Sequence, residues 1–256
     1  MDLHVVFQVV FGHAEDWSDP ARLDTELAYL SEITLPSLAA QTHSNFRLLV
    51  LCDDAHDEET RNRIRHAIWA RLDRRKAKVI FRGQGDAAKF LTKSTNGRWD
   101  DRPWRVQIAL DHDSAVASDY VARIRATAKT RIRKMRAPDD YLFLAFGTHY
   151  SLNIGDGDAQ LYEKPSRRGD SGLALLAPHG HGMSPQSFRG QPISNEHPID
   201  LIGGSKPFVL ALFCPRAIKI ARPVETGQDD RALLDAAKRF GWLGRAIDAL
   251  PAQRVH

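Results

Sequence analysis

Apolar and polar residues follow one another along the first half of the chain in blocks with the lengths of strands and helices. Three short apolar runs have the character of strands buried on both faces, and they occupy residues 4–11, 46–52 and 79–81. Between these runs, apolar residues recur at helical spacing over residues 20–34 and 57–73. Asp19 and Pro20 fit the cap and the first position of the earlier helix. The order strand–helix–strand–helix–strand predicts a parallel α/β sheet.

A fourth strand and a third long helix are predicted further along the chain. Residues 83–104 are rich in loop-forming residues and contain one short helical candidate at 86–92. Three alternating apolar residues then lead to an acidic tripeptide, and they are Val106, Ile108 and Leu110. Apolar residues at helical spacing return over residues 120–136. The acidic tripeptide is therefore expected between the end of a buried strand and a helix.

The second half of the chain has shorter apolar runs and is richer in Gly, Pro, Ser and His. Strands are predicted at residues 141–146, 173–177 and 208–214, and a β-hairpin at 151–162 around a Gly-Asp-Gly turn. Residues 178–204 are expected to form one long loop, a kind of segment that often carries function. Residues 229–250 have a mostly helical pattern.

Composition narrows the class of protein without naming it. A chain of 256 residues with 43% hydrophobic and 27% charged residues is ordinary for a globular protein and can bury a sizeable core. The net charge of +4 suits a phosphate-bearing substrate or an anionic membrane surface, and it does not indicate nucleic acid.

Neither a disulfide framework nor a membrane span is predicted. Cys52 and Cys214 are the two cysteines, and both lie in apolar runs, as buried reduced thiols do. A reducing cytoplasm is the simpler expectation. The first residues lack the positive segment and cleavage site of a signal peptide, and no apolar run approaches the roughly 20 residues of a transmembrane helix.

The tripeptide Asp111-His112-Asp113 carries the strongest indication of chemistry. Two carboxylates flanking one residue at the end of a strand can hold Mg²⁺ or Mn²⁺ against a diphosphate. Ligands of open α/β sheets bind at the carboxyl ends of the strands, where Asp53 and Asp54 follow the second strand. These two residues can accept hydrogen bonds from a base or a ribose, or they can cap the next helix. A capped turn is the alternative for the tripeptide too.

Two passages of the sequence are similar to those of a known enzyme class. Residues 35–50, Leu-Pro-Ser-Leu-Ala-Ala-Gln-Thr-His-Ser-Asn-Phe-Arg-Leu-Leu-Val, resemble the SL-x-x-QT-x-x-NF-x-L passage of glycosyltransferases with the GT-A fold. Residues 110–115, followed by Tyr120-Val121, resemble the D-x-D passage of the same enzymes. More narrowly, both passages resemble a bacterial family of rhamnosyltransferases. The resemblance covers residues 1–136 and extends only loosely beyond them.

The resemblance implies a GT-A-like α/β fold, a mixed sheet flanked by helices, as a single domain over residues 1–256. Residues 1–136 would form the nucleotide-sugar-binding half, and residues 137–256 the smaller acceptor-binding half with the hairpin. The implied reaction moves a sugar, rhamnose or another deoxyhexose, from a nucleotide-sugar donor to an acceptor hydroxyl. The implied acceptor is a saccharide or a glycolipid, and the implied cofactor is a divalent metal, Mg²⁺ or Mn²⁺.

The same resemblance implies roles for the acidic residues. Carried over by position, Asp111 and Asp113 hold the metal and the diphosphate. Asp53, with Asp54 beside it, matches the acid that contacts the nucleoside. His112 departs from the family pattern, in which an acid often stands inside the motif. The departure lowers the local negative charge and leaves metal dependence open.

Two further roles have candidates in the sequence. Arg98 and Arg105, or Lys206, can offset the charge that develops on the leaving nucleoside diphosphate. An inverting transfer also needs a general base near the acceptor hydroxyl. The predicted long loop offers His179, His181, Glu196 and His197. We favour His197 with Glu196, because they lie just before the apolar segment that returns to the core, and a plain loop role is the alternative for each.

The predicted helix at 120–136 is unusually basic. Its cations are Arg123, Arg125, Lys129, Arg131, Arg133, Lys134 and Arg136. They can form a solvated face opposite the apolar stripe, or they can contact anionic lipid or a charged polysaccharide at a membrane periphery. No aromatic residues are interleaved with these charges as in nucleic-acid-binding surfaces, so nucleic acid is not an expected partner.

Two other functions fit parts of the sequence. A phosphatase of the haloacid-dehalogenase type also carries D-x-D after an apolar strand, and Asp229-Asp230 can mimic its later acidic pair. Three α/β units precede the motif here, however, and Ala115 stands where Thr or Val is typical. The second rival is a non-catalytic nucleotide-sugar-binding module on the same fold. Asp111→Ala separates this module from an enzyme, because only an enzyme has turnover to lose.

Overall fold

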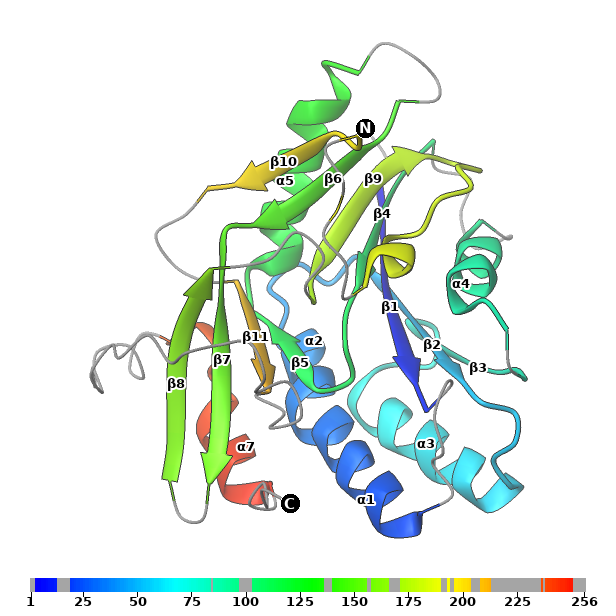
Figure 1. The fold of residues 1–256 in the computed structure, drawn as a ribbon, viewed down its shortest axis with the longest axis vertical. Helices are drawn as coiled ribbons and strands as arrows, with labels where there is room; N and C mark the ends of the chain where they lie inside the picture. The colour runs from blue at the N-terminus through cyan, green and yellow to red at the C-terminus, as the bar shows by residue number, and fades with distance from the viewer. Residues whose placement is uncertain are drawn as a thin grey trace.

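Two β-sheets form the framework of the molecule (Figure 1). The structure is a computed structural model, and it describes residues 3–12, 19–83, 85–96, 103–135, 140–155, 158–165, 171–189, 193, 196–203, 208–212, 236 and 238–250. Within these residues, seven strands form the larger sheet and four form the smaller one. The sheets share one hydrophobic core that includes residues from Leu3 to Leu250.

The larger sheet is mixed and has the strand order β10-β6-β9-β4-β1-β2-β3. Its strands are β1 (Leu3–Phe11), β2 (Arg47–Cys52), β3 (Ala77–Phe81), β4 (Trp104–Ala109), β6 (Leu142–Phe146), β9 (Leu173–Pro178) and β10 (Ile199–Ile202). The first four are parallel, whereas β9 runs antiparallel between β4 and β6. The predicted α/β class with a mixed sheet is therefore confirmed.

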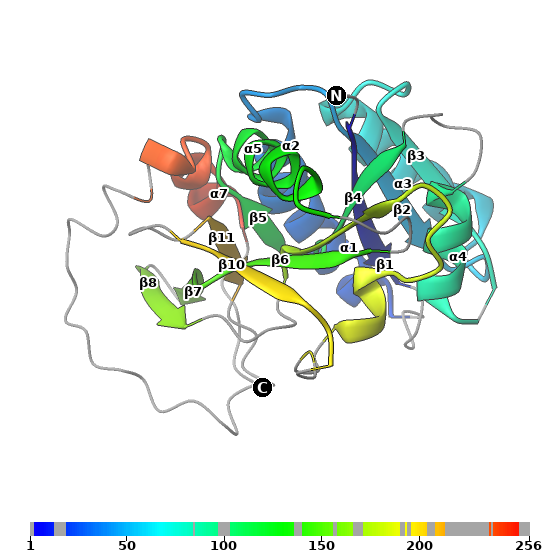
Figure 2. The same cartoon turned by 90° about the horizontal axis from the view of Figure 1, so that it is seen from above.

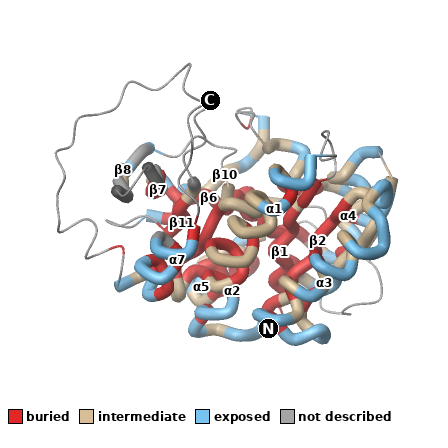
Figure 3. The backbone as a smooth tube through the Cα atoms, turned by 90° about the horizontal axis from the view of Figure 1, so that it is seen from below, coloured by how far each residue is buried: buried red, intermediate tan, exposed pale blue. Residues whose placement is uncertain are grey.

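Helices cover both faces of the larger sheet (Figure 2). In chain order they are α1 (Pro20–Tyr29), the π-helical turn η1 (Leu30–Thr34), α2 (Leu35–Ala39), α3 (Glu58–Arg71), α4 (Ala87–Thr95), α5 (Tyr120–Ile132), the 3-10 turn η2 (Pro185–Phe188) and α7 (Leu243–Ala249). Alternate residues of β1 face opposite sides: Phe7 joins the core that includes α1, α3 and α5, whereas Val6 packs with Leu91 of α4. Burial on both sides explains why the central strands are continuous apolar runs (Figure 3).

The smaller sheet joins segments that are far apart in the sequence. Its strands, in the order β5-β11-β7-β8, are β5 (Ser114–Val116), β11 (Val209–Leu212), β7 (Thr148–Gly155) and β8 (Asp158–Pro165). The predicted hairpin is present as β7 and β8, and its turn at residues 156–157 lies outside the described residues. Because β5 pairs with β11, residues 1–136 and residues 137–256 both contribute strands to this sheet.

Several elements differ from the sequence-based expectations. The expectation of one long loop over residues 178–204 is wrong, because η2 and β10 lie within it. The four residues of β10 become a strand by pairing with β6, a long-range contact that no local pattern reveals. The first helix continues through η1 and α2 to Ala39, and α4 extends to Thr95.

Cys214 and residues 229–235 lie outside the described part of the chain. No described helix has both the length and the apolar character that crossing a membrane requires.

Candidate active site

The carboxyl ends of β1, β2 and β4 meet at one edge of the larger sheet. Phe11 of β1 pairs with Cys52, and Gln8 pairs with Ala109, so residues 53–54 and residues 111–113 leave the sheet on either side of β1. With neighbouring strands about 4.8 Å apart, β2 and β4 lie roughly 10 Å apart across β1. Their ends are also staggered along the strands, because β2 ends level with Phe11 and β4 ends level with Gln8. Beyond the end of β1, Gly12 adopts a φ of 62°, a left-handed conformation that favours glycine. The structure thus brings the four predicted aspartates to one edge.

The turn that carries Asp111 and Asp113 is held by a buried threonine at the end of η1. The Thr34 hydroxyl oxygen lies 3.3 Å from the Asp111 carbonyl, 2.6 Å from the His112 carbonyl and 2.9 Å from the Ser114 carbonyl. One hydroxyl proton is thus shared among three acceptors of the same turn. Thr34 ends the π-helical turn η1, and such turns occur frequently at functional sites. The acidic turn is therefore attached to the helical layer, although three strands, β2, β3 and β4, separate Thr34 from it in the sequence.

The Ser-Leu-x-x-Gln-Thr passage binds the segment that follows the acidic turn. Ser37 Oγ accepts a hydrogen bond from the Val116 N–H at 3.3 Å. Gln41 Nε2 donates to the Ala117 carbonyl at 2.8 Å, and Gln41 Oε1 accepts from the Val121 N–H at 3.0 Å. These side chains link α2 to both β5 and the start of α5. The two passages that resemble glycosyltransferases are thus physical partners in the fold.

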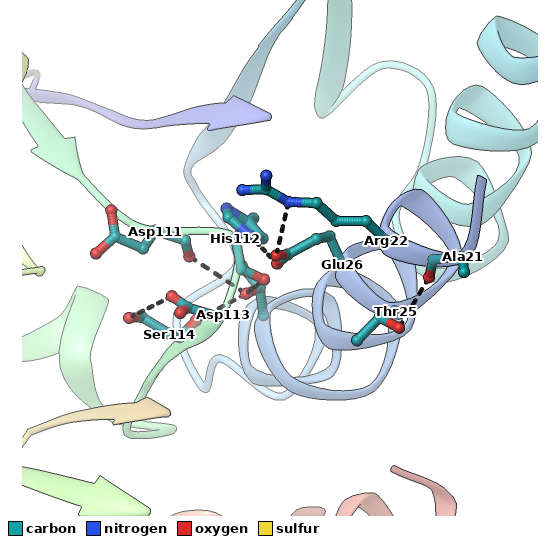
Figure 4. Close-up of polar contacts among 9 residues, drawn as sticks. Ala21, Arg22, Thr25, Glu26, Asp111, His112, Asp113 and Ser114 are labelled. Atoms are coloured by element: carbon teal, nitrogen blue, oxygen red, sulfur yellow. Dashed lines mark hydrogen bonds and ion pairs between the residues drawn. The ribbon is translucent and has the colours of Figure 1, made fainter. Parts of the chain in front are cut away.

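The histidine inside the acidic tripeptide forms an ion pair of its own. His112 Nε2 lies 2.7 Å from Glu26 Oε2 on α1, and Arg22 Nε approaches the same carboxylate at 4.0 Å (Figure 4). Burial alone lowers the pKa of His112, but the Glu26 hydrogen bond and the nearby carboxylates outweigh it and raise the pKa above its usual value. A protonated His112 offsets part of the negative charge around Asp113.

Asp113 is a partly buried carboxyl group in an acidic environment. Burial is the largest cause that raises the pKa of Asp113 to about 6, and His112 opposes this shift, whereas Asp111 and Glu26 add to it. The Ser114 hydroxyl donates to Asp113 Oδ1 at 3.4 Å, a weak hydrogen bond. An ionised Asp113 is therefore costly in the absence of a bound cation.

Asp113→Asn should stabilise the protein at pH 8 and have little effect at pH 4, when metal is removed with a chelator. The folded-state pKa of about 6 lies above the ordinary value of 3.8, so protonation favours the folded state. This contribution is fully present below pH 3.8 and is lost as the pH rises through 6. Asparagine avoids the loss, and the gain at pH 8 should be about 3 kcal/mol. Urea unfolding at pH 4, 6 and 8 measures the difference, and a difference that does not vary with pH would contradict the prediction.

Asp111 contacts a cation from a distant segment of the chain. Asp111 Oδ2 forms an ion pair with Arg189 Nη2, 78 residues further along the sequence. The Asp111 N–H donates to Ser171 Oγ at 3.0 Å. Its carboxylate points away from the pair formed by His112 and Glu26 (Figure 4). Sequence reasoning missed Arg189, because it lies inside the segment expected to be an undivided loop, and no local signal distinguishes it.

Asp53 and Asp54 occupy the loop between β2 and α3. Asp53 Oδ1 accepts a hydrogen bond from the Ala55 N–H at 2.9 Å. The cap of α3 is Asp57, which accepts from the Thr60 N–H, so the alternative of a capping role for Asp53 or Asp54 is wrong. A Cβ at Gly83, after β3, would lie only 3.1 Å from Asp54 Oδ1, so the two loops approach closely.

The structure does not bring Arg105 to the acidic edge. Arg105 is the second residue of β4, six residues before Asp111, which corresponds to about 20 Å along an extended chain. Its side chain is fully buried. The guanidinium donates to the Thr95 carbonyl and to Asn96 Oδ1, and it contacts the His179 ring at 3.1 Å. These contacts describe a structural residue that joins β4 to α4.

His197, the favoured base, lies in an aromatic cluster. His197 Nδ1 is 2.7 Å from the Tyr141 hydroxyl, and the imidazole meets the Phe188 ring edge-on with centroids 5.0 Å apart. Glu196 beside it is exposed. No described contact joins either residue to the acidic turn.

The strand register shows how far His197 is from the acidic edge. Through β6 and β9, Ile199 of β10 is level with Gln107 of β4, so His197 lies near the level where β4 begins. Asp111 follows the opposite end of β4. The structure therefore separates the favoured base from the acidic turn. Arg98, Lys206 and Asp229-Asp230 lie outside the described residues.

Asp111 and Asp113 fit a metal that is bound mainly by a substrate. Mg²⁺ and similar ions commonly take one or two carboxylates and complete their coordination with phosphate oxygens and water. Among the described residues, no group of three or more His, Cys, Asp and Glu could hold a metal ion. The Asp111 carboxylate already binds a cationic group, and ionisation of the partly buried Asp113 is costly without one. His112 is engaged by Glu26 and does not fit as a ligand.

The fold and the acidic turn define a class of protein. Four parallel strands in the order 3-2-1-4, an antiparallel strand beside the fourth, and an acidic turn at the end of the fourth form a GT-A-like α/β fold. The family model described as "Putative rhamnosyl transferase" matches residues 13–210, and the chain belongs to this family. No curated protein matches the sequence. No finding supports the phosphatase alternative.

Solved structures of glycosyltransferases resemble the chain at low sequence identity. S. aureus TarS is 14% identical with a TM-score of 0.44, and the match covers 83% of this chain and 37% of the TarS chain. GalNAc-T7 with UDP, GalNAc and Mn²⁺ is 14% identical with a TM-score of 0.42, covering 96% and 50%. Mouse xyloside xylosyltransferase 1 is 15% identical with a TM-score of 0.33, covering 58% and 54%. The chain thus spans about a third to just over a half of the length of these proteins.

Proposed function

We propose that the protein transfers a sugar from a nucleotide-sugar donor to an acceptor hydroxyl with the assistance of a divalent metal. The observation that carries the proposal is the pair Asp111 and Asp113 at the carboxyl ends of the parallel strands of the larger sheet, across β1 from Asp53 and Asp54. The family description supports rhamnose, or another deoxyhexose, as the sugar.

The proposed roles follow from the positions of the residues. Asp53 and Asp54 would bind the nucleoside, and Asp111 and Asp113 would hold Mg²⁺ or Mn²⁺. When bound, the metal offsets the negative charge that develops on the leaving nucleoside diphosphate. β5 begins at Ser114 and pairs with β11, so the strands of residues 137–256 border the donor edge. This region would receive the saccharide or glycolipid acceptor.

A cytoplasmic location with peripheral membrane contact is a second part of the proposal. On α5 and in the two residues directly after it, the exposed cations are Arg123, Lys129, Arg133 and Lys134. Arg125 is instead buried and donates to the Leu3 carbonyl at 2.8 Å, and Arg131 pairs with Asp200. The exposed cations are a candidate surface for anionic headgroups around a glycolipid.

A thermal-shift panel tests the donor proposal. Nucleotide sugars and nucleoside diphosphates, each with Mn²⁺ or Mg²⁺, should include at least one compound that raises the melting temperature. A ligand at about 100 times its Kd adds about 2.7 kcal/mol to the free energy of unfolding. The stabilisation should disappear with EDTA and in Asp111→Asn. A panel of uridine, thymidine, guanosine and adenosine diphosphates and their common sugars without any metal-dependent shift would contradict the proposal.

A further inference from the structure

Arg189 belongs to a segment that is firmly attached beside the acidic edge. The preceding turn η2 is capped by Ser184, whose hydroxyl also donates to Gln8 Oε1 at 3.0 Å. Gln186 Nε2 donates to the Gln8 carbonyl of β1 at 2.8 Å. Phe188 packs against Phe143 with ring centroids 5.0 Å apart. The backbone that carries Arg189 is thus held to the sheet by several long-range contacts.

The Arg189 side chain is paired with the carboxylate of Asp111, which the proposed function assigns to the metal. Its guanidinium is paired with Asp111 Oδ2 and is only partly exposed. A metal ion on the same oxygen would place two cations side by side, and the repulsion between them is strong where water is partly excluded. Metal and guanidinium therefore compete for Asp111.

A diphosphate gives the displaced guanidinium another anionic partner. The planar fork of arginine binds phosphate oxygens in the same bidentate way as a carboxylate. A diphosphate bound at the proposed donor site would lie beside the starting position of Arg189, because Arg189 is paired with Asp111 of that site. The long side chain can exchange one anion for the other while its backbone stays attached to η2.

We propose that Arg189 is a resident counter-ion of Asp111 that exchanges onto the diphosphate when metal and donor bind together. The inference rests on the proposed donor site at Asp111 and Asp113. It makes Arg189 a donor-binding residue and makes metal and diphosphate binding mutually dependent. Metal alone binds weakly because it must displace Arg189 from Asp111. When the diphosphate binds as well, Arg189 gains a new anionic partner in place of Asp111.

Isothermal titration of Mn²⁺, with and without inorganic pyrophosphate, tests the exchange in the whole chain. Without pyrophosphate, Arg189→Gln should bind Mn²⁺ about tenfold more tightly than wild type, because the competing cation is gone. At saturating Mn²⁺, the same variant should bind pyrophosphate about tenfold more weakly. Arg131→Gln is the matched control, because it removes an arginine–aspartate pair on α5, and it should match wild type in both titrations.

Two more variants separate the possible failures. Arg189→Lys keeps the charge, so Mn²⁺ should bind it as weakly as wild type, which attributes the Arg189→Gln result to the lost charge. If Asp111→Asn abolishes Mn²⁺ binding but Arg189→Gln leaves it unchanged or weaker, the exchange is wrong and the donor site stands. If Asp111→Asn binds Mn²⁺ as wild type does, the donor site itself is wrong and the exchange falls with it.

Discussion

Asp111→Asn should reduce metal-dependent turnover of the nucleotide sugar by at least about a hundredfold. The substitution keeps the size of the side chain but removes the charge that would hold the metal at the diphosphate. The Asp111 N–H bond to Ser171 and the Thr34 contact involve the backbone, so the turn should keep its shape. Release of nucleoside diphosphate, measured with the donor identified by the thermal-shift panel, gives the rate.

The control for this variant is Asp200→Asn. Asp200 is a partly buried aspartate that also pairs with an arginine, but it lies on β10 and contacts Arg131 of α5. Its loss should leave turnover within about twofold of wild type. Equal turnover in Asp111→Asn and wild type would contradict the assignment. Metal-dependent donor binding without any turnover in wild type would favour the non-catalytic module.

Gln41→Leu should lower the free energy of unfolding by about 2–4 kcal/mol. Leucine fills a similar volume but cannot satisfy the two buried backbone groups that Gln41 bonds, the Ala117 carbonyl and the Val121 N–H. It also loses the bond from Gln41 to the Ser37 carbonyl at 2.9 Å. Urea unfolding monitored by tryptophan fluorescence measures the change.

Thr42→Ala provides the comparison for Gln41→Leu. The Thr42 hydroxyl donates to the Ser118 carbonyl at 3.2 Å from an exposed position, so its loss should cost at most about 1 kcal/mol. A similar small loss for Gln41→Leu would show that the segment from β5 to α5 does not depend on this side chain. In the expected case, turnover of Gln41→Leu should also fall at temperatures where it remains folded, because the same segment positions the acidic turn.

Local patterns predicted most of the central strands and helices because burial on both faces leaves a strong signal. β1, β2 and β4 are apolar runs, and α3 repeats apolar residues at one face. β5 and β10 were missed, since strands of three and four residues depend on partners far away in the sequence. The π-helical turn η1 was missed for a related reason. It joins two helical segments without any break in the apolar pattern.

By itself, the sequence determined the α/β class, the acidic turn at the end of β4 and the resemblance that the family match confirms. These features are local, because periodicity and motifs are written in neighbouring residues. Only the tertiary structure decided which side chains meet the turn. It brought Thr34, Glu26 and Arg189 to Asp111–Asp113 and placed His197 near the opposite end of the strands. The physical reason is that such contacts depend on strand order and register, which arise from burial of the whole core rather than from any single segment.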